Sequence, residues 1–491
     1  MNNAKSRACL ERPGTYLFAA ICVVCHAITL AQTSAITAST IYKETSSGLR
    51  VSTPSQADAV EPNSTKRRLD EVAGSFTKDD AFMGAVLVAK GSDILLDKGY
   101  GKAVMEWNIP DSPDVKFRIG SMTKQFTAAL VLLEQEDGKL SVDDPIRKYL
   151  PDSPPTWDKI TIADLLHHTS GVPNFIFDKR FFEWRMVSHT PAEEMELFKD
   201  KPLNFLPGAQ WEYSNSNYAL LGIILEKVTG QRYVDLLQKR IFVPLGMKDS
   251  GLDDDDLILP DRAEGYQPGS KGIVPVRSQS MSVGWSTGAM YSTTGDLLRW
   301  ERGLFGGKVL SASSLKQMTT ATKGNYGCGV FVSRRDDMEV VEHGGSIEGF
   351  NSYMIYVPAR NIAVIALSNV GGDAPDKMAA KLLDVTLGKT VSLAKQRVAV
   401  PIAKGELSKF VGDYQISAQL SLNITASDEG LVVLATGQPP LQFSYEGQIN
   451  GHPQFFTRAM DAQIEFIPTA TDHVSTLVLH LSGAAMTGKR P

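Results

Sequence analysis

Apolar positions along the chain follow two different periods, which predict two kinds of element. Residues 83–90 and 94–100 are short runs of apolar and β-branched side chains separated by Gly91-Ser92, a pattern typical of paired strands. After Ser121 the period changes, and apolar side chains recur at i, i+4 and i+7, at Phe126, Leu130 and Leu133. This spacing predicts a long helix with one buried face.

A second strand-rich block follows later in the chain. We expect strands at residues 326–332, 338–342, 350–357 and 362–369, followed by a helix at 374–387. Strands at both ends of the region enclose helical stretches. The pattern therefore predicts an α+β fold, in which an antiparallel sheet is flanked by helices and carries a helical subdomain.

The C-terminal part has a third pattern. From Leu407 onward, six or more short apolar runs separated by turn signals follow one another within ninety residues, which predicts a small all-β barrel or sandwich. We therefore expect an α+β domain at residues 61–390, a linker at 391–405 and a β domain at 406–491.

The N-terminal part lacks these patterns. Three basic residues, Lys5, Arg7 and Arg12, precede an apolar run at 16–30, which is the pattern of a signal peptide. We expect residues 1–31 to be a signal peptide and 32–60, rich in Ser, Thr and Ala, to be a flexible leader. The alternative is a retained membrane anchor, although a spanning helix needs about 20 apolar residues. We expect export to the periplasm or the medium, with membrane contact only through this segment if it is uncleaved.

Composition narrows the class of protein. A length of 491 residues indicates two or three folded units. The formal net charge of −5 comes without the basic excess that phosphate binding requires, which argues against a nucleic-acid partner. Of the four cysteines, only Cys328 would remain after removal of residues 1–31, so we expect no intrachain disulfide. We interpret Cys328 as a buried small side chain within a strand.

Ser121-Met122-Thr123-Lys124 places a hydroxyl and an amine three residues apart at the start of the long helix. Positions i and i+3 share a helix face, so the amine can reach the hydroxyl. Serine–lysine pairs are a known alternative to the Ser-His-Asp triad. Gly120 suits a sharp turn into the helix, and desolvation favours the neutral amine that a base requires.

The spacing by itself carries little weight. The chain contains four Ser-x-x-Lys tetrads, and at ordinary usage of serine and lysine about two are expected by chance. They begin at Ser75, Ser121, Ser313 and Ser392. Only the second begins a long amphipathic helix, which makes it the candidate nucleophile.

Two further motifs each occur once. Tyr213-Ser214-Asn215 is the only Tyr-x-Asn among fourteen tyrosines, and His343-Gly344-Gly345 is the only His-x-Gly among eight histidines. The order Ser-x-x-Lys, Tyr-x-Asn, His-x-Gly resembles the serine beta-lactamase and penicillin-binding-protein family, specifically its class C beta-lactamase, D,D-peptidase and esterase branch. Flanking segments add to the resemblance, namely residues 165–173, 205–208 and 286–290.

The resemblance covers roughly residues 65 to 390 and implies the family's antiparallel sheet with a helical part beside it. The segments 410–414 and 437–440 resemble the lipocalin-like C-terminal domain attached to many serine hydrolases of this family. That second resemblance favours a small barrel at residues 406–491. Its role, in substrate access or in assembly, stays open.

The resemblance also implies roles for single residues. Ser121 would be the acylated nucleophile, and Lys124 would take and return its proton. Tyr213 would act as the second acid/base and protonate the leaving group, because a neighbouring lysine can lower the pKa of a phenol. Asn215 would hold the substrate amide and the lysine.

The far wall of the site is implied in the same way. The backbone N–H groups of Ser121 and Ser346 would form the oxyanion hole, since two convergent donors stabilise the tetrahedral charge. Ser346 directly follows Gly345, and His343 would line the cleft. The resemblance identifies no residue in the position of a dedicated deacylating glutamate.

His343-Gly344-Gly345 differs from the Lys-Thr-Gly of most beta-lactamases, which occurs nowhere in this chain. Lysine and threonine there suit a substrate carboxylate. Histidine is only partly charged near neutrality, and Gly344 has no hydroxyl. The difference favours esters, amides or D-amino-acid peptides over substrates that require a carboxylate anchor.

We therefore expect an exported serine hydrolase that acts on an ester, amide or lactam carbonyl of a small molecule or peptide, without a metal or cofactor. The alternatives are a D,D-carboxypeptidase or D-aminopeptidase on peptidoglycan-type peptides, and a penicillin-binding sensor that acylates without turnover. We interpret His167-His168 as no metal site, because adjacent histidines on a helix diverge. Residues 253–256 lack the spacing of a calcium loop and are expected to be a solvated loop.

Overall fold

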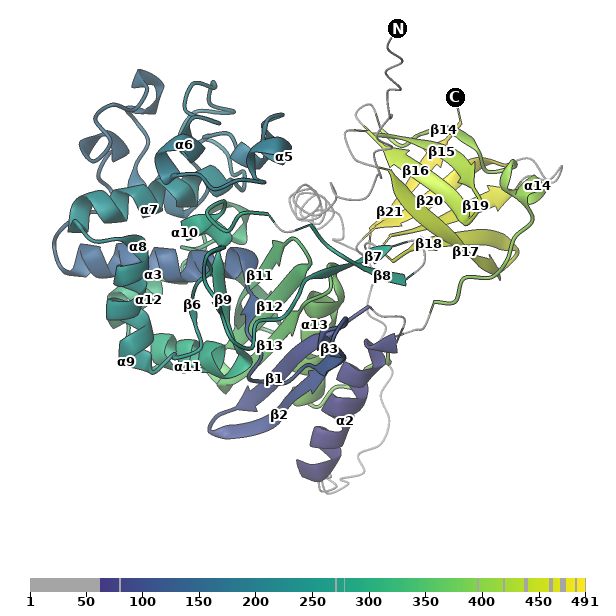
Figure 1. Cartoon of the computed structure of the whole chain (residues 1–491), viewed down its shortest axis with the longest axis horizontal. Helices are drawn as coiled ribbons and strands as arrows, with labels where there is room; N and C mark the ends of the chain where they lie inside the picture. Colours follow the sequence, from purple (N-terminus) through teal and green to yellow (C-terminus); the bar gives the residue numbers. More distant parts are fainter. Residues whose placement is uncertain are drawn as a thin grey trace, which may run out of the picture.

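The computed structural model describes residues 62–490, except 79–80, 270–271, 278, 395–396, 418–419, 437–439, 459–461, 469–473 and 482–483. The expected signal peptide at 1–31 and leader at 32–60 lie outside the described residues. So does most of the 437–440 segment. In Figure 1 the chain runs from a mixed helix and sheet domain to a separate set of strands at its C-terminal end.

Six strands of the described chain form the central antiparallel sheet, in the order β10-β11-β12-β13-β1-β2. Their bounds are β1 Gly84–Lys90, β2 Asp93–Tyr100, β10 Phe331–Arg335, β11 Met338–Ile347, β12 Phe350–Val357 and β13 Ile362–Ser368. Strand β1 pairs with both β2 and β13, from Gly84↔Ser368 to Lys90↔Ile362. Segments far apart in the sequence therefore share one sheet, which confirms the α+β prediction.

Helices cover both faces of this sheet, because its central strands are apolar on both sides. On β1, Val86 and Val88 pack on one core with α2 (Pro62–Ser75) and α13 (Ala374–Thr386). Ala85 and Leu87 point the other way, into the larger core that contains α3 (Thr123–Glu136). This alternation follows the two-residue period of a strand.

Helix α3 differs from its prediction. Its apolar spacing predicts one buried face, but the residues from Thr123 to Glu134 are all buried. The reason is its position between the sheet and the helical part, where it packs against α7 (Asn215–Thr229), α10 (Trp285–Gly288) and α12 (Ala312–Met318). Helix α3 is therefore the central element of the domain.

The helical subdomain lies on one side of α3, at the upper left of Figure 1. The remaining helices of the domain are α4 Ile162–Leu166, α5 Phe181–Trp184, α6 Pro191–Met195, α8 Tyr233–Leu237, α9 Val243–Leu245 and α11 Thr294–Phe305. Short strands add small sheets: β3 Lys102–Val104 with β4 Ile109–Pro110, β5 Phe117–Arg118 with β9 Met290–Ser292 and β6 Gly251–Leu252, and β7 Tyr266–Gly269 with β8 Gly272–Pro275.

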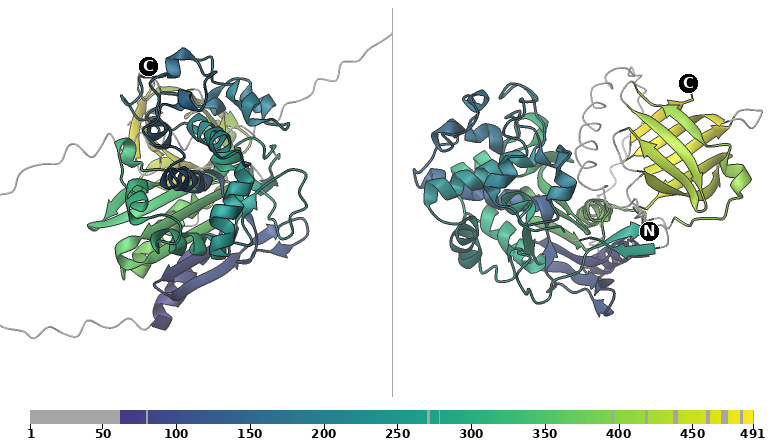
Figure 2. Two further views of the ribbon diagram at one scale, coloured as in Figure 1. Left: turned by 90° about the vertical axis from the view of Figure 1, so that its left-hand side faces the viewer. Right: turned by 45° about the horizontal axis from the view of Figure 1, so that its top comes forward.

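Eight strands of the described part of residues 412–489 close into a barrel, visible on the right of Figure 2. They are β14 Gly412–Gln415, β15 Ser421–Ser427, β16 Gly430–Ala435, β17 Leu441–Ile449, β18 His452–Thr457, β19 Ala462–Pro468, β20 Val474–Leu481 and β21 Ala484–Lys489, preceded by α14 Lys404–Leu407. Buried aromatic rings fill the core, including Phe410, Tyr414, Phe455 and Phe466. The prediction of a small C-terminal barrel is confirmed.

The strand predicted at residues 326–332 is wrong at its start. Strand β10 begins only at Phe331, and the preceding residues form a tight turn in which Gly327 N donates to Val330 O at 2.8 Å. Gly329 has a φ of 74°, a conformation that favours glycine. Cys328 lies in this turn, buried and unbonded to another cysteine, rather than within a strand.

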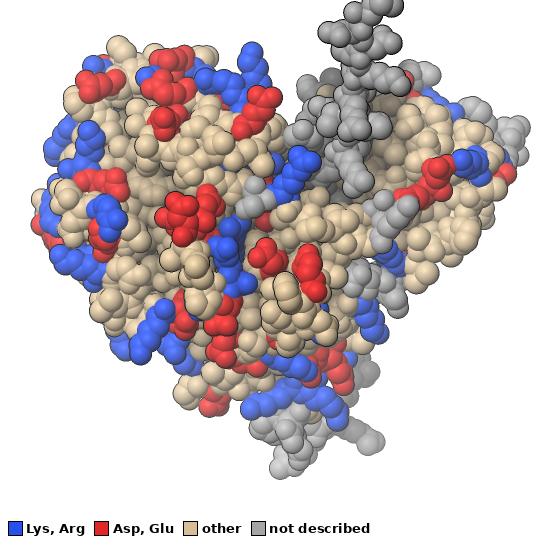
Figure 3. All heavy atoms as spheres, in the orientation of Figure 1, with Lys and Arg blue, Asp and Glu red and all other residues tan. Residues whose placement is uncertain are grey.

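The surface carries charges of both signs. Lys and Arg side chains are interspersed with Asp and Glu over the face that Figure 3 shows. Within the described part of the chain, no helix combines the length and the apolar composition that crossing a bilayer requires.

Candidate active site

The segment before α3 holds Ser121 against strand β11. Gly120 has a φ of 52° and begins the 3-10 turn Gly120–Met122 that leads into the helix. A Cβ atom at Gly120 would lie 2.6 Å from the backbone nitrogen of Ser346. Only glycine allows so close an approach, which confines Ser121 to the edge of a cavity between the sheet and the helical part.

Lys124 is fully buried, and its amine faces three oxygen atoms. Its Nζ atom lies 3.1 Å from Ser121 Oγ, 2.8 Å from Asn215 Oδ1 and 2.8 Å from the carbonyl oxygen of Thr287. Burial lowers the pKa of Lys124 well below its usual value. Asn215 and Thr287 each supply an acceptor to the amine, which holds it in reach of the Ser121 hydroxyl.

Asn174 fixes the orientation of Asn215. Its Oδ1 atom accepts from the backbone N–H and from Nδ2 of Asn215, at 3.2 and 3.3 Å, which turns Asn215 Oδ1 toward Lys124. Sequence reasoning missed Asn174, although it directly follows the 165–173 segment. It also missed the carbonyl of Thr287, whose segment 286–290 was noted only for its resemblance.

Tyr213 lies beside the same amine. Its ring centroid is 5.0 Å from Lys124 Nζ, and the residue lines the cavity. The ring packs on His168, with centroids 4.4 Å apart. The structure therefore brings Ser121, Lys124, Tyr213 and Asn215 together around one amine.

His168 supports this arrangement from beneath. Its Nδ1 atom accepts from Ser214 N at 3.3 Å and lies 3.1 Å from Asn217 Nδ2. Burial holds its pKa well below the usual value, so the ring is neutral. Among the residues that the structure describes, no cluster of three or more His, Cys, Asp or Glu is placed to hold a metal ion.

Strand β11 forms the far wall, and it extends through Ile347, beyond the predicted end at residue 342. A Cβ atom at Gly345 would lie 1.9 Å from Ile119 O, so this position also requires glycine. His343 Nε2 is 3.1 Å from Tyr326 Oη, and Nδ1 is 2.5 Å from Gly344 O. Both ring nitrogens of His343 thus have partners within the wall itself.

The cavity has a volume of about 270 Å³. Aromatic side chains give it apolar sides: Phe175, Phe181, Trp211 and Phe331. Ser121, Tyr213, Asn215, His343, Gly345 and Ser346 all line it. Three acidic residues also line it, Glu348, Asp373 and Asp376, and none of its described lining residues is Lys or Arg. Glu348 is paired with the buried Arg185.

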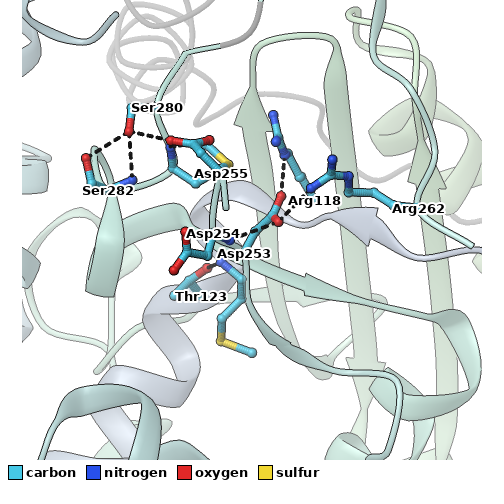
Figure 4. A network of polar contacts seen from close by, with 10 residues as sticks. Arg118, Thr123, Asp253, Asp254, Asp255, Arg262, Ser280 and Ser282 are labelled. Carbon is cyan, nitrogen blue, oxygen red and sulfur yellow. Dashed lines mark hydrogen bonds and ion pairs between the residues drawn. The ribbon is translucent and has the colours of Figure 1, made fainter. Parts of the chain in front are cut away.

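A network of charged and polar side chains lies beside the start of helix α3, as Figure 4 shows. Asp253 accepts from Arg118 Nε at 2.7 Å and from Arg262 Nη1 at 3.0 Å. Thr123 Oγ1 donates to Gly120 O at 2.8 Å and accepts from Met290 N at 3.2 Å. The solvated loop expected at 253–256 is therefore wrong for Asp253, which is buried because two arginines neutralise it.

The other Ser-x-x-Lys tetrads lie elsewhere. Ser75 donates from its hydroxyl to Val72 O in α2, Ser313 is on α12, and Ser392 accepts from Lys381. None of the three lines the cavity.

Comparisons with known proteins agree with this geometry. The Beta-lactamase family model matches residues 69–387. Penicillin-binding protein 4* of Bacillus subtilis (strain 168) is 26% identical over 450 residues, which cover 85% of this chain and 97% of that protein. The chain is also similar to the D-amino acid amidase from Ochrobactrum anthropi SV3 complexed with D-phenylalanine, at 26% identity and a TM-score of 0.58 over 67% of this chain and 98% of the other. The octameric penicillin-binding protein homologue from Pyrococcus abyssi shares the fold, at 24% identity and a TM-score of 0.61, over 88% of this chain and 100% of the other.

Proposed function

This chain belongs to the beta-lactamase family and is a serine hydrolase, and from that premise we propose that it cleaves ester, amide or lactam carbonyls through an acyl-enzyme on Ser121. The observation that carries the proposal is the position of Lys124 Nζ, 3.1 Å from Ser121 Oγ and held by two other acceptors.

In the first step Lys124 acts as the base. Ser121 Oγ attacks the substrate carbonyl carbon while the serine proton moves to the neutral amine. The carbonyl oxygen becomes an oxyanion, for which the backbone N–H groups of Ser121 and Ser346 are the proposed donors. The approach of Gly120 to the Ser346 nitrogen supports this pairing.

In the second step the proton leaves Lys124. We assign its transfer to the leaving group to Tyr213, whose ring lies beside the amine and faces the cavity. The carbon–leaving-group bond then breaks, and an ester between the acyl group and Ser121 remains. Water releases the acyl group when the same residues act in reverse, which regenerates the neutral lysine and the free hydroxyl.

The cavity supports substrates without a carboxylate anchor. Its described lining contains acidic but no basic side chains, and His343 has both nitrogens engaged within the wall. A carboxylate would find no fixed positive charge there. A second candidate is a D-aminopeptidase or D-amino acid amidase, because one similar structure is described as a D-amino acid amidase. The acidic lining adds little to it, since Glu348 and Asp373 are paired with Arg185 and Lys377 and burial raises the pKa of Asp376 to about 7.

We also propose that the chain is exported. The basic residues and apolar run of 1–31 support this. Sequencing the N-terminus of the protein from the native host tests it, since a start within residues 32–60 is expected and a start at Met1 contradicts cleavage.

Intact-mass measurement with a fluorophosphonate and a labelled penicillin tests the nucleophile. We expect one adduct per chain on Ser121, none in Ser121→Ala, and an unchanged adduct in the matched control Ser313→Ala. Labelling that survives in Ser121→Ala contradicts the assignment. A transient adduct with ester or amide substrates means turnover, whereas a persistent one means a sensor.

A further inference from the structure

Glu194 is a buried acid with no role in the site described above. It lies on α6, where Thr190 and Glu193 form a capping box at the solvent-exposed start of the helix. Glu194 is only 3% exposed, and it shares an inward face with Leu197 and Phe198. Its Oε1 atom is buried without a hydrogen-bond partner. A carboxyl group in such a place is costly, which points to a function.

The carboxyl group of Glu194 touches the segment that holds the base. The backbone N–H of Gly284 lies close enough to this carboxyl group to lower its pKa, against the larger opposite effect of burial. Gly284, at a φ of 95°, precedes α10, and its carbonyl oxygen accepts from Gly288 N at 2.6 Å and Thr287 Oγ1 at 2.7 Å. The carbonyl of Thr287 in turn accepts from Lys124 Nζ at 2.8 Å. Three contacts therefore connect Glu194 to the lysine.

The charge state of Glu194 matters to the same amine. Burial raises the pKa of Glu194 to about 8, so the carboxyl group is protonated at neutral pH. An ionised Glu194 would raise the pKa of Lys124 through the attraction between the two charges. A protonated Glu194 leaves Lys124 without a counter-ion, so that burial keeps the pKa of the amine low.

Few other titratable groups surround this acid. From α3 it faces Lys124, and α10 contributes no titratable side chain. Helix α7, which packs on α6, contributes the buried Tyr218, whose phenol donates to Leu166 O. On α6 itself, Glu193 is exposed to solvent. Lys124 is thus the charged group whose behaviour Glu194 can change.

We propose that Glu194 is a positioning residue for the Ser121 reaction: its buried carboxyl group anchors the Gly284–Gly288 turn, which places the carbonyl of Thr287 against Lys124. The inference rests on the proposed function. Glu194 does not line the cavity, so it is no candidate for a deacylating base. It acts through the turn and through the lysine.

Two substitutions separate the anchoring from the charge. Glu194→Gln keeps an uncharged acceptor for the Gly284 N–H, and we expect p-nitrophenyl ester turnover within about threefold of wild type. The acid limb of its rate profile, which reports the loss of neutral Lys124, should stay within about 0.3 pH unit. Glu194→Leu leaves the Gly284 donor unpaired, and we expect kcat to fall about tenfold or more with KM changed less than about twofold.

Glu301 supplies the matched control. It is also buried, with an Oε2 atom lacking a partner, and burial raises its pKa to about 8, but it lies on α11 and does not line the cavity. We expect Glu301→Gln and Glu301→Leu to leave kcat, KM and the acid limb unchanged within about twofold.

Two results would overturn the proposal. If the acid limb of Glu194→Gln moves about one unit to lower pH, Glu194 is an ionised counter-ion of Lys124. If Glu194→Leu keeps wild-type kcat, the anchor is not needed; should that variant not fold, the acid limb of the Gln variant still decides. Wild-type protein that is never labelled on Ser121 contradicts the proposed function itself, whereas a labelled wild type with either result above contradicts only this inference.

Discussion

Two buried basic side chains lie at opposite sides of the start of α3, and they differ in their partners: one is paired with a carboxylate and the other is not. Arg118 at the back is paired with Asp253, which also binds Arg262. Lys124 at the front faces only uncharged oxygens, from Ser121, Asn215 and Thr287. Paired charge at the back stabilises the fold. Burial without a charged partner at the front lowers the pKa of the amine, as the proposed role of Lys124 as a base requires.

The largest effect is expected from replacing Lys124, the basic side chain without a charged partner. We expect Lys124→Met to reduce acylation of Ser121 by about 10³-fold or more, because general-base catalysis contributes about 10² to 10⁴. Stopped-flow acylation by a p-nitrophenyl ester measures it. Retention of more than about a tenth of the wild-type rate would contradict the role of the lysine.

The same variant tests the charge state through stability. Lys124 is protonated in the unfolded chain up to its ordinary pKa of 10.5, whereas burial lowers that pKa in the fold. Between the lowered pKa and 10.5 the unfolded state therefore binds more protons, and wild-type stability rises with pH across that window by up to about 1.4 kcal/mol per pH unit relative to Lys124→Met. Urea unfolding at several pH values checks this, and a pH-independent difference would contradict a neutral lysine.

Removing the charge partner at the back should affect folding rather than chemistry. Asp253→Ala leaves two arginines without their carboxylate, and we expect a loss of about 3–5 kcal/mol in the free energy of unfolding. Thermal and urea unfolding measure it, with the exposed neighbour in Asp254→Ala as the matched control. An Asp253 variant as stable as the control would show that the network contributes nothing.

The smallest effect is expected from the support of Asn215. Asn174→Ala removes the acceptor that orients this amide, and we expect up to about a tenfold decrease in acylation rate, with a loss of about 1–3 kcal/mol in the free energy of unfolding because partly buried donors of Asn215 lose their partner. The exposed Asn204 offers a control in Asn204→Ala. Equal rates in the two variants would mean that the amide of Asn215 is held by Lys124 alone.

Periodicity was sufficient to place most of the strands and the long helix, but it missed that α3 is buried on all sides, because that depends on the elements packed around it. It failed at Cys328, where two glycines turn an apolar run into a loop. It also failed at Asp253, because a run of four acids gives no sign of the arginines that lie more than 100 residues away or across the loop.

The candidate site likewise contains residues that short sequence motifs identify and residues that only tertiary contacts reveal. Ser121, Lys124, Tyr213 and Asn215 stand in short motifs, and the structure brings them together. Asn174 and Thr287 act through a side-chain amide and a backbone carbonyl whose positions depend on tertiary contacts. Glu194 looks like an ordinary acid in the first turn of a helix, and sequence reasoning missed it; its spacing to the apolar Leu197 and Phe198 is the one signal that could have found it.

The sheet order has a consequence for biosynthesis. Ser121 and Lys124 are translated early, but the wall that completes their cavity comes from later strands. These strands reach the segment before α3 through contacts such as Ser352 Oγ to Ile119 O, 233 residues apart in sequence. A nascent chain that ends before β13 leaves β1 without its central partner. Such long-range pairing forms slowly. The cavity around Ser121 can therefore be complete only after the strands up to β13 have been translated.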